Sequence, residues 1–247
     1  MSFPLIAKPN IGERGFLVQK INSEEELQKY IYENSSTDFI IQEFVNYEIE
    51  LGVLYFRFPD APAGKVSSVT LKEFLNVTGD GRSSILELME KNARARFQIK
   101  RLKAKMGEKI FQIPQQREEI ILEFAGNHCL GTKFINGNHL INEKLNTVFD
   151  TIAKPINGFY YGRFDLKVKS LDDLYEGKNI KIMELNGVSS DPTHIFDPNS
   201  YLLKAYKDLA SHWKIIYLIS KKNRDNGIKP VTFSVLYKTI SNHFRSR

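Results

Sequence analysis

The stretch FYYGRFDLKVKSLDDLYEGKNIKIMELNG, residues 159–187, predicts two β-strands joined by a polar loop. In the first strand, alternation places Arg163 and Asp165 on one face and apolar side chains on the other. In the second strand, Ile182, Glu184 and Asn186 share one face. If the two strands pair, the side chains of Arg163, Asp165, Glu184 and Asn186 converge on one surface.

The oxygen-bearing side chains of this surface suit a hard cation. Asp165, Glu184 and Asn186 offer carboxylate and amide oxygens without any His or Cys. Such a set favours Mg²⁺, whose shell in proteins is usually completed by substrate phosphates. The alternative is a half-exposed hairpin with a solvated polar face. This stretch alone does not choose between the two interpretations.

The composition is that of an ordinary soluble globular protein. The chain has 247 residues, of which 42% are hydrophobic and 26% charged, enough for one large core or two modest ones. No apolar run reaches the roughly 20 residues that a membrane helix needs, and the first residues lack a secretory signal pattern. Cys129 is the only cysteine, which excludes an intrachain disulfide and indicates a reducing, cytoplasmic location.

The positive charge is concentrated in two segments. The formal net charge is +6, while residues 91–109 and 214–247 each hold eight Lys or Arg and one acid, so the remaining residues carry −8. Binding to nucleic acid or to an anionic membrane is one interpretation of such segments. Neither segment has a nucleic-acid motif, and a solvated helix face is the preferred explanation. The 91–109 helix could alternatively cover a site that handles anions.

The first 60 residues predict a small α+β unit. Residues 4–21 indicate a strand, a glycine-containing turn and a second strand, and residues 22–34 a helix with Ser23 as its N-cap. Two further strands follow at 39–45 and 49–58. The turn-rich segment 59–64 is the expected boundary, so we predict a small lobe over 1–60 and a large lobe over 61–247.

The large lobe is predicted to begin with a strand over 65–77 that carries Lys72. A helix over 85–105, strands at 109–114 and 119–126, and a helix over 143–156 follow. The helix over 199–221 has an apolar stripe that we expect to face the core. In the loop at 126–142, His128 could reach a carboxyl or phosphate group, although such a histidine more often satisfies a loop backbone.

Five segments in order give the chain a resemblance to a known family. They are PLIAKPNIGERG, IIQEFV followed by Glu50, VTLKEFLNVTGDG, GRFDLKV and MELNG. In this order they resemble the ATP-grasp superfamily, and within it the D-alanine–D-alanine ligase and cyanophycin synthetase branch. The resemblance spans nearly the whole chain and implies an α+β ATP-grasp fold, with ATP held between two α+β lobes.

The resemblance also implies roles for individual residues. Lys8 and Lys72 would contact the ATP phosphates, and Arg163 the transferred phosphoryl group, so that Arg163 and Lys72 are the expected catalytic residues. Asp165, Glu184 and Asn186 would bind Mg²⁺, with two ions expected. Glu50, or less favourably Glu48, would meet the ribose hydroxyls. The remaining nucleotide contacts would come from the phosphate loop and the adenine segment: Gly12, Glu13, Arg14, Gly15, Gln42, Glu43, Phe44 and Val45.

The implied reaction is phosphoryl transfer from ATP to a substrate carboxylate, followed by attack of an amine on the acyl phosphate. Such ligases usually carry another domain ahead of the first lysine strand, whereas Lys8 is eight residues from the start. We therefore expect a truncated piece or a partner chain that supplies this surface. A non-catalytic or regulatory nucleotide-binding module is the alternative function.

Overall fold

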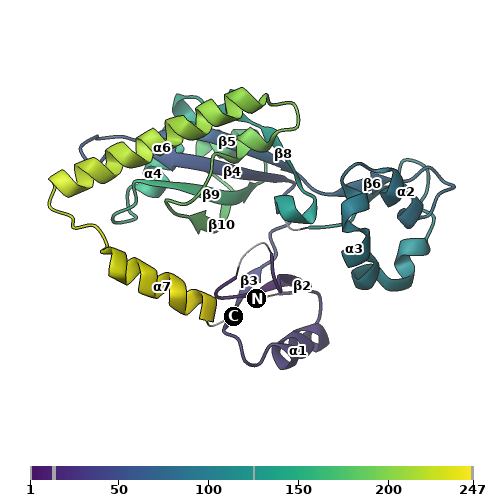
Figure 1. The fold of residues 1–247 in the computed structure, drawn as a ribbon. Coiled ribbons are helices and arrows are strands. Elements are labelled where there is room, and N and C mark those ends of the chain that lie inside the picture. Colours follow the sequence, from purple (N-terminus) through teal and green to yellow (C-terminus); the bar gives the residue numbers. More distant parts are fainter. Residues whose placement is uncertain (1, 13–14, 125, 246–247) are drawn as a thin grey trace.

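The computed structural model describes residues 2–12, 15–124 and 126–245, and it contains three β-sheets (Figure 1). The first sheet joins β1 (Leu5–Pro9), β2 (Gln19–Ile21) and β3 (Phe39–Glu43) in the order β2-β1-β3. Helix α1 (Glu24–Glu33) begins after Ser23, whose side chain accepts a hydrogen bond from the Glu26 amide. Together these elements form the small lobe. Its core consists of Leu5, Ala7, Ile21 and Tyr30.

The second sheet has five antiparallel strands in the order β10-β9-β4-β5-β8. They are β4 (Ile49–Phe56), β5 (Lys65–Glu73), β8 (Lys133–Asn136), β9 (Tyr161–Val168) and β10 (Ile180–Asn186). The sequence prediction grouped the 49–58 strand with the small lobe. Its hydrogen-bonded neighbours are β5 and β9, so it belongs to the second sheet. Local alternation predicts a strand but not its partners.

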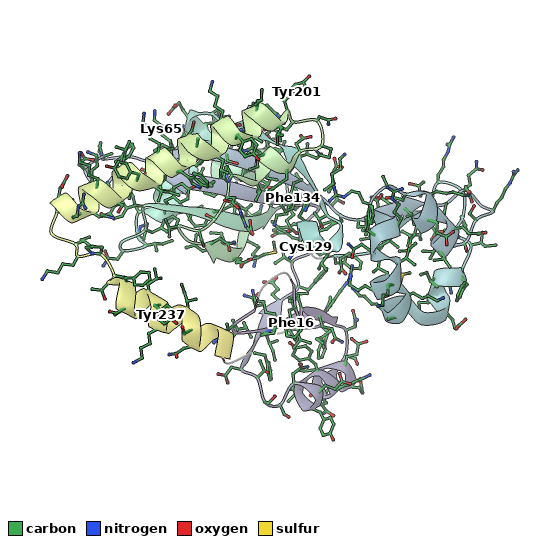
Figure 2. All side chains as sticks on the ribbon, viewed as in Figure 1. Phe16, Lys65, Cys129, Phe134, Tyr201 and Tyr237 are labelled. Carbon is green, nitrogen blue, oxygen red and sulfur yellow. The ribbon has the colours of Figure 1, made fainter. Side chains whose placement is uncertain are left out.

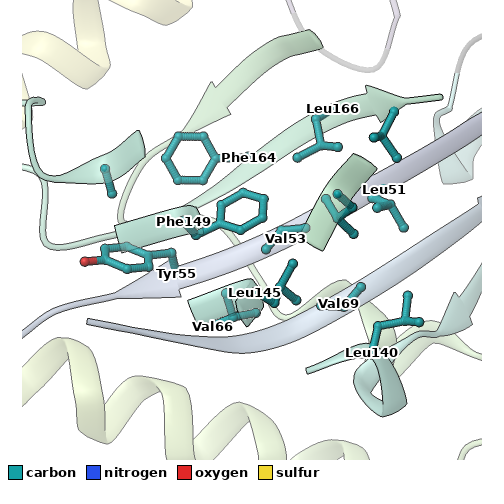
Figure 3. Close-up of a cluster of buried hydrophobic side chains, with 13 residues drawn as sticks. Leu51, Val53, Tyr55, Val66, Val69, Leu140, Leu145, Phe149, Phe164 and Leu166 are labelled. Atoms are coloured by element: carbon teal, nitrogen blue, oxygen red, sulfur yellow. The ribbon is translucent and has the colours of Figure 1, made fainter. Parts of the chain in front are cut away.

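One face of the five-stranded sheet builds the largest core. Helices α4 (Glu143–Ala153) and α5 (Leu171–Glu176) pack against it, and Figure 3 shows the close contact of Tyr55, Phe149 and Phe164 in this cluster. Because side chains alternate along a strand, the residues between these apolar positions point to the opposite face. On β9 those residues include Arg163, Asp165 and Lys167, and on β4 they include Glu50, and these polar side chains belong to the candidate site.

The opposite face is covered over part of its area by helix α6 (Leu202–Asp225), which runs along the sheet in Figure 1. Leu54, Tyr161 and Ile219 are buried together there. The prediction that the apolar stripe of this helix faces the core was wrong for several residues. Those that are 61–83% exposed are Leu202, Leu203, Tyr206, Trp213 and Tyr217. Of the α6 side chains, His212 and Ile219 are buried, and Ile215 and Ile216 pack partly against the same cluster.

The third sheet belongs to a helical insert, residues 74–124, that projects to one side in Figure 1. It pairs β6 (Asn76–Thr78) with β7 (Glu119–Ile121) and carries α2 (Ile85–Lys91) and α3 (Ile99–Met106). The predicted single helix over 85–105 is interrupted after Lys91 and continues as a 3₁₀ helix, Ala95–Gln98, before α3. The predicted strand at 109–114 is wrong, because Gly107–Phe111 is a 3₁₀ helix that packs Ile110 into the core of the insert.

The chain ends in helix α7 (Phe233–Arg245). Among the described residues, no helix combines the length and the apolar character that crossing a membrane would require. The α+β class predicted from the sequence is confirmed by these sheets and helices.

Candidate functional site

The two strands of the 159–187 stretch pair as predicted, with Asn186 opposite Arg163 and Glu184 opposite Asp165. The register shifts between Ile182 and Glu184, so Met183 is an extra residue in β10. The prediction that Ile182 shares a face with Glu184 was therefore wrong, since Ile182 pairs with Leu166 of the core face. The bulge turns Glu184 and Asn186 toward the polar face. The expected polar loop also contains helix α5, capped by Ser170.

A compact hydrogen-bonded group forms where these strands meet. The Arg163 guanidinium donates from Nε to Asp165 Oδ1 at 2.9 Å and from Nη2 to Asp165 Oδ2 at 3.2 Å. Asn186 Nδ2 also donates to Asp165 Oδ2 at 3.2 Å. Gly52 on β4 gives this group its space, because a Cβ there would lie 3.2 Å from both the Arg163 and Asp165 side chains. The Glu184 carboxylate is exposed and has no hydrogen-bond or ion-pair partner in the described part of the chain.

A buried ion network continues from this group across the sheet. Lys72 Nζ lies 3.1 Å from Glu50 Oε1 and 3.7 Å from Asp165 Oδ1. Lys167 Nζ lies 3.9 Å from the other oxygen of Glu50. Burial lowers the pKa of Lys167, while Glu50 acts in the opposite direction. With Arg163, the network holds three cationic side chains against two buried carboxylates, so it carries an excess of positive charge suited to a polyanion.

The small lobe reaches this network at the bulge of β10. Lys8 Nζ donates to the Met183 carbonyl oxygen at 3.5 Å, next to Glu184 in the chain. Lys181 of β10 pairs with Glu43 of β3 at 2.9 Å. Lys8, the predicted phosphate lysine, therefore lies at the edge of the predicted metal face, although Lys8 and Met183 are 175 residues apart in the sequence.

Gly15 of the predicted phosphate loop and residues 42–45, the predicted adenine segment, also border this region. Gly15 has a φ of +74°, and a Cβ there would lie 3.0 Å from Leu130. In the adenine segment, the Phe44 ring lies 4.0 Å from Lys20 Nζ and 5.9 Å from Lys167 Nζ. Gln42 pairs with Ile6 in the small lobe, Val45 is half-buried, and Gly12 lies near Pro9. Glu13 and Arg14 lie outside the described residues.

The segment that follows β7 covers the ion network. A Cβ at Gly126 would overlap the Glu50 carboxylate and the Lys72 side chain, so only glycine fits there without a shift. In Figure 2, Cys129 lies between Phe134 of the five-stranded sheet and Phe16 of the small lobe. His128 has no carboxyl partner among the residues that the structure describes. Its ring packs between Phe134 and Phe196 at 5.4 and 5.5 Å, and burial lowers its pKa.

A cavity of about 470 Å³ adjoins Lys72 at the junction of the sheet and the helical insert. A volume of several hundred Å³ is typical of small-molecule sites. Glu48 lines this cavity, whereas Glu50 is only 4% exposed beneath Gly126. Arg94, from the basic segment of the insert, also lines it and donates to the carbonyl oxygens of Gly131 and Thr132. The structure thus leaves Glu48, and not Glu50, accessible to a ligand.

The polar face also carries a network that the sequence analysis did not find. Ser68 Oγ on β5 lies 2.7 Å from His194 Nδ1, and His194 Nε2 lies 3.1 Å from Asp208 Oδ2 on α6. Thr70 and Thr193 bond at 2.9 Å beside them. These contacts attach the segment after Asn186 to the sheet. Ser68 is more than 120 positions from His194, and Thr70 is likewise more than 120 positions from Thr193. No local sequence pattern indicates that these residues meet.

Comparisons with known proteins give structural matches only. No family model and no curated protein matches the chain. It is similar to the crystal structure of a bifunctional glutathione synthetase from Pasteurella multocida, with 18% identity, a TM-score of 0.44, and coverage of 85% of this chain and 30% of that one. It is also similar to the crystal structure of the VanG D-Ala:D-Ser ligase from Enterococcus faecalis, with 14% identity and a TM-score of 0.43. That match covers 90% of this chain and 49% of the ligase.

The chain thus spans less than half the length of both enzymes. Because identity and TM-scores are low, any functional conclusion has to come from the residues of this chain.

Proposed function

We propose that this chain is an ATP-grasp module that binds Mg²⁺-ATP between its small lobe and its five-stranded sheet and phosphorylates a substrate carboxylate. The observation that carries the proposal is the position of Lys8. It comes from a different sheet, yet its Nζ lies at the backbone of Met183, beside Glu184 and opposite the group formed by Arg163, Asp165 and Asn186. Cations from two sheets therefore face one set of oxygen ligands.

The donor set fits a magnesium ion whose shell is completed by a ligand. Asp165, Glu184 and Asn186 supply oxygens, and no group of three or more His, Cys, Asp or Glu side chains suited to a metal occurs in the described ranges. Two carboxylates and an amide alone would hold Mg²⁺ weakly, so phosphate oxygens are needed to complete the shell. When bound, the metal would neutralise charge on the transferred phosphoryl group.

The residues of the chain have separate tasks in this proposal. Arg163 is fixed by Asp165 in a fork geometry, which suits bidentate contact with a phosphoryl group. Lys72 and Lys8 hold phosphate charge, and phosphoryl transfer needs such positioning more than a covalent group. The ribose would contact Glu48 at the 470 Å³ cavity. The edge of the adenine would contact the backbone of residues 42–45.

The second half of the proposed reaction joins an amine to the activated carboxylate. The ammonium form of the amine first loses a proton to solvent, and its nitrogen then attacks the acyl carbon. The bond between that carbon and the phosphate oxygen breaks, phosphate leaves, and a second proton passes from nitrogen to solvent as the amide forms. This makes the protein a carboxylate–amine ligase, with a carboxylate and an amine as small-molecule substrates. A further domain or a partner chain would complete the substrate side.

The test is ADP release from Mg²⁺-ATP in the presence of mixed carboxylic acids and amines. We expect release that requires an acid, and we expect Glu184→Gln with Asn186→Ala to lower it by at least about 10²-fold. Glu176→Gln, an exposed acid on α5 that pairs with Lys178, is the matched control and should retain the rate. A thermal shift with Mg²⁺-ATP but no ADP with any substrate pool would instead identify a regulatory nucleotide-binding module.

A further inference from the structure

A small second cavity lies directly against the proposed phosphoryl-transfer arginine. It has a volume of about 70 Å³ and lies between the segment 188–192 and helix α6. Arg163 Nη1 donates to the backbone oxygen of Asp191, a wall residue, at 3.2 Å. The cavity is therefore adjacent to the group formed by Arg163, Asp165 and Asn186, on the side away from the helical insert.

Most polar groups in the wall of this cavity are already engaged. The Tyr161 hydroxyl donates to the Ser190 carbonyl oxygen at 3.4 Å. His212 uses both ring nitrogens, bonding the Asp208 carbonyl oxygen at 2.7 Å and Ser67 Oγ at 3.0 Å. Both side chains are 5% exposed, so they form a fixed wall. They are poorly placed to exchange these partners for a ligand.

Asp191 differs from these residues. Its carboxylate has no hydrogen-bond or ion-pair partner among the described residues, although Asp191 lines the cavity. Burial, with a smaller contribution from Asp191, raises the pKa of Tyr161 to about 12, so the phenol stays neutral near pH 7. Among the described lining residues Asp191, which is exposed, carries the one carboxylate, while the Arg163 guanidinium beside the cavity is a positive charge that acts on the pKa of Tyr161 in the opposite direction. The rest of the lining includes the indole of Trp213 and the apolar side chains of Leu209 and Ile216.

We infer that this cavity binds the amine of the proposed reaction as a small primary ammonium ion that carries no carboxylate of its own. The identification of this ligand as the amine substrate rests on the proposed function, whereas the binding of an ammonium ion by the cavity does not. The Asp191 carboxylate supplies a counter-ion, and Tyr161 and Trp213 in the lining are residue types whose rings attract cations. A carboxylate group on the ligand would be repelled by the Asp191 carboxylate.

The size of the cavity limits the ligand further. A buried water needs roughly 10–15 Å³ of such a volume, so about 70 Å³ holds around five water-sized groups. Methylammonium, ethylammonium and ethanolammonium fit this limit. A branched amine such as triethylammonium, or the side chain of a peptide with its backbone, does not.

Trp213 makes the inference directly measurable, because it is the only tryptophan in the chain and lies in the cavity wall. The experiment is a fluorescence titration of the full chain, at constant ionic strength and without ATP. We expect a saturable change with ethylammonium and none with triethylammonium or with ethanol, a neutral molecule of similar size. This comparison uses the unaltered protein, so it does not depend on a variant that folds.

A variant series tests the role of the carboxylate. Asp191→Asn should weaken ethylammonium binding by about 2- to 5-fold, since the contact loses its charge and Asp191 is exposed. Asp172→Asn, which removes an exposed acid from α5, should leave it unchanged. Equal responses to ethylammonium and ethanol, or an unchanged affinity in Asp191→Asn, would overturn the inference.

The two proposals fail in distinguishable ways. If acid-dependent ADP release occurs but ethylammonium leaves Trp213 fluorescence unaffected, the amine site is wrong and the proposed function stands. If ethylammonium binds through Asp191 but no acid supports ADP release, the cavity is a cation site and the proposed function is wrong.

Discussion

Replacing Arg163 by alanine is expected to lower acid-dependent ADP release by about 10³-fold, the scale on which an arginine that faces a transferred phosphoryl group acts. The guanidinium is held by two hydrogen bonds to Asp165 and one to the Asp191 carbonyl oxygen, so it is oriented before any substrate binds. Removing it takes away a preorganised charge where the reaction develops negative charge. Steady-state kinetics with saturating Mg²⁺-ATP would measure the loss.

Two companion variants separate charge from geometry. Arg163→Lys keeps the positive charge but cannot form the fork, so its rate should fall between those of the unaltered protein and Arg163→Ala. Arg82→Ala, an exposed arginine in the turn before α2, is the matched control and should be unaffected. If Arg163→Ala retained the full rate, Arg163 would have no part in the chemistry.

Replacing Glu50 by alanine is expected to lower the free energy of unfolding by roughly 3–5 kcal/mol. Glu50 is buried between Lys72 and Lys167, and its loss leaves Lys167 without its carboxylate partner and Lys72 with only the Asp165 contact at 3.7 Å. Urea denaturation followed by circular dichroism would give the difference. The size of the effect comes from the unpaired charges that remain, and not from a large intrinsic strength of the ion pair.

A surface pair of the same chemistry provides the comparison. Glu73 pairs with Lys133 at 3.1 Å, but both side chains are more than one-third exposed, so Glu73→Ala should cost less than about 1 kcal/mol. Adding Lys167→Met to Glu50→Ala should recover part of the lost stability, because the buried charge that has lost its partner is removed. Similar losses in Glu50→Ala and Glu73→Ala would show that the Glu50 network is solvated.

The sequence was most informative where the signal was local. Alternation in 159–187 correctly placed Arg163, Asp165 and Asn186 on one face, and the capping residue Ser23 correctly marked the start of α1. The bulge at Met183 was missed, because an extra residue in a strand depends on its partner strand. The positions of Glu184 and Asn186 opposite Asp165 and Arg163 were predicted in spite of that error, because both residues follow the bulge, where the alternation is regular.

Contacts between distant segments could not be predicted from local patterns. The partners of β4 are set by packing across the second sheet. The accessibility of Glu48 and the burial of Glu50 follow from the position of Gly126, which lies about 75 residues further along the chain. The exposed aromatic side chains of α6 look like core residues in sequence, because spacing shows that a face is apolar but not what covers it.

The central claim is that Mg²⁺-ATP is held by both lobes at once. Hydrogen–deuterium exchange of the full chain with saturating Mg²⁺-ATP tests it most directly. The account predicts slower exchange in β1 and the 42–45 segment together with residues 163–167 and 184–186, while α2 and α3 of the helical insert stay unchanged. Protection confined to one lobe, or none in either, would contradict it.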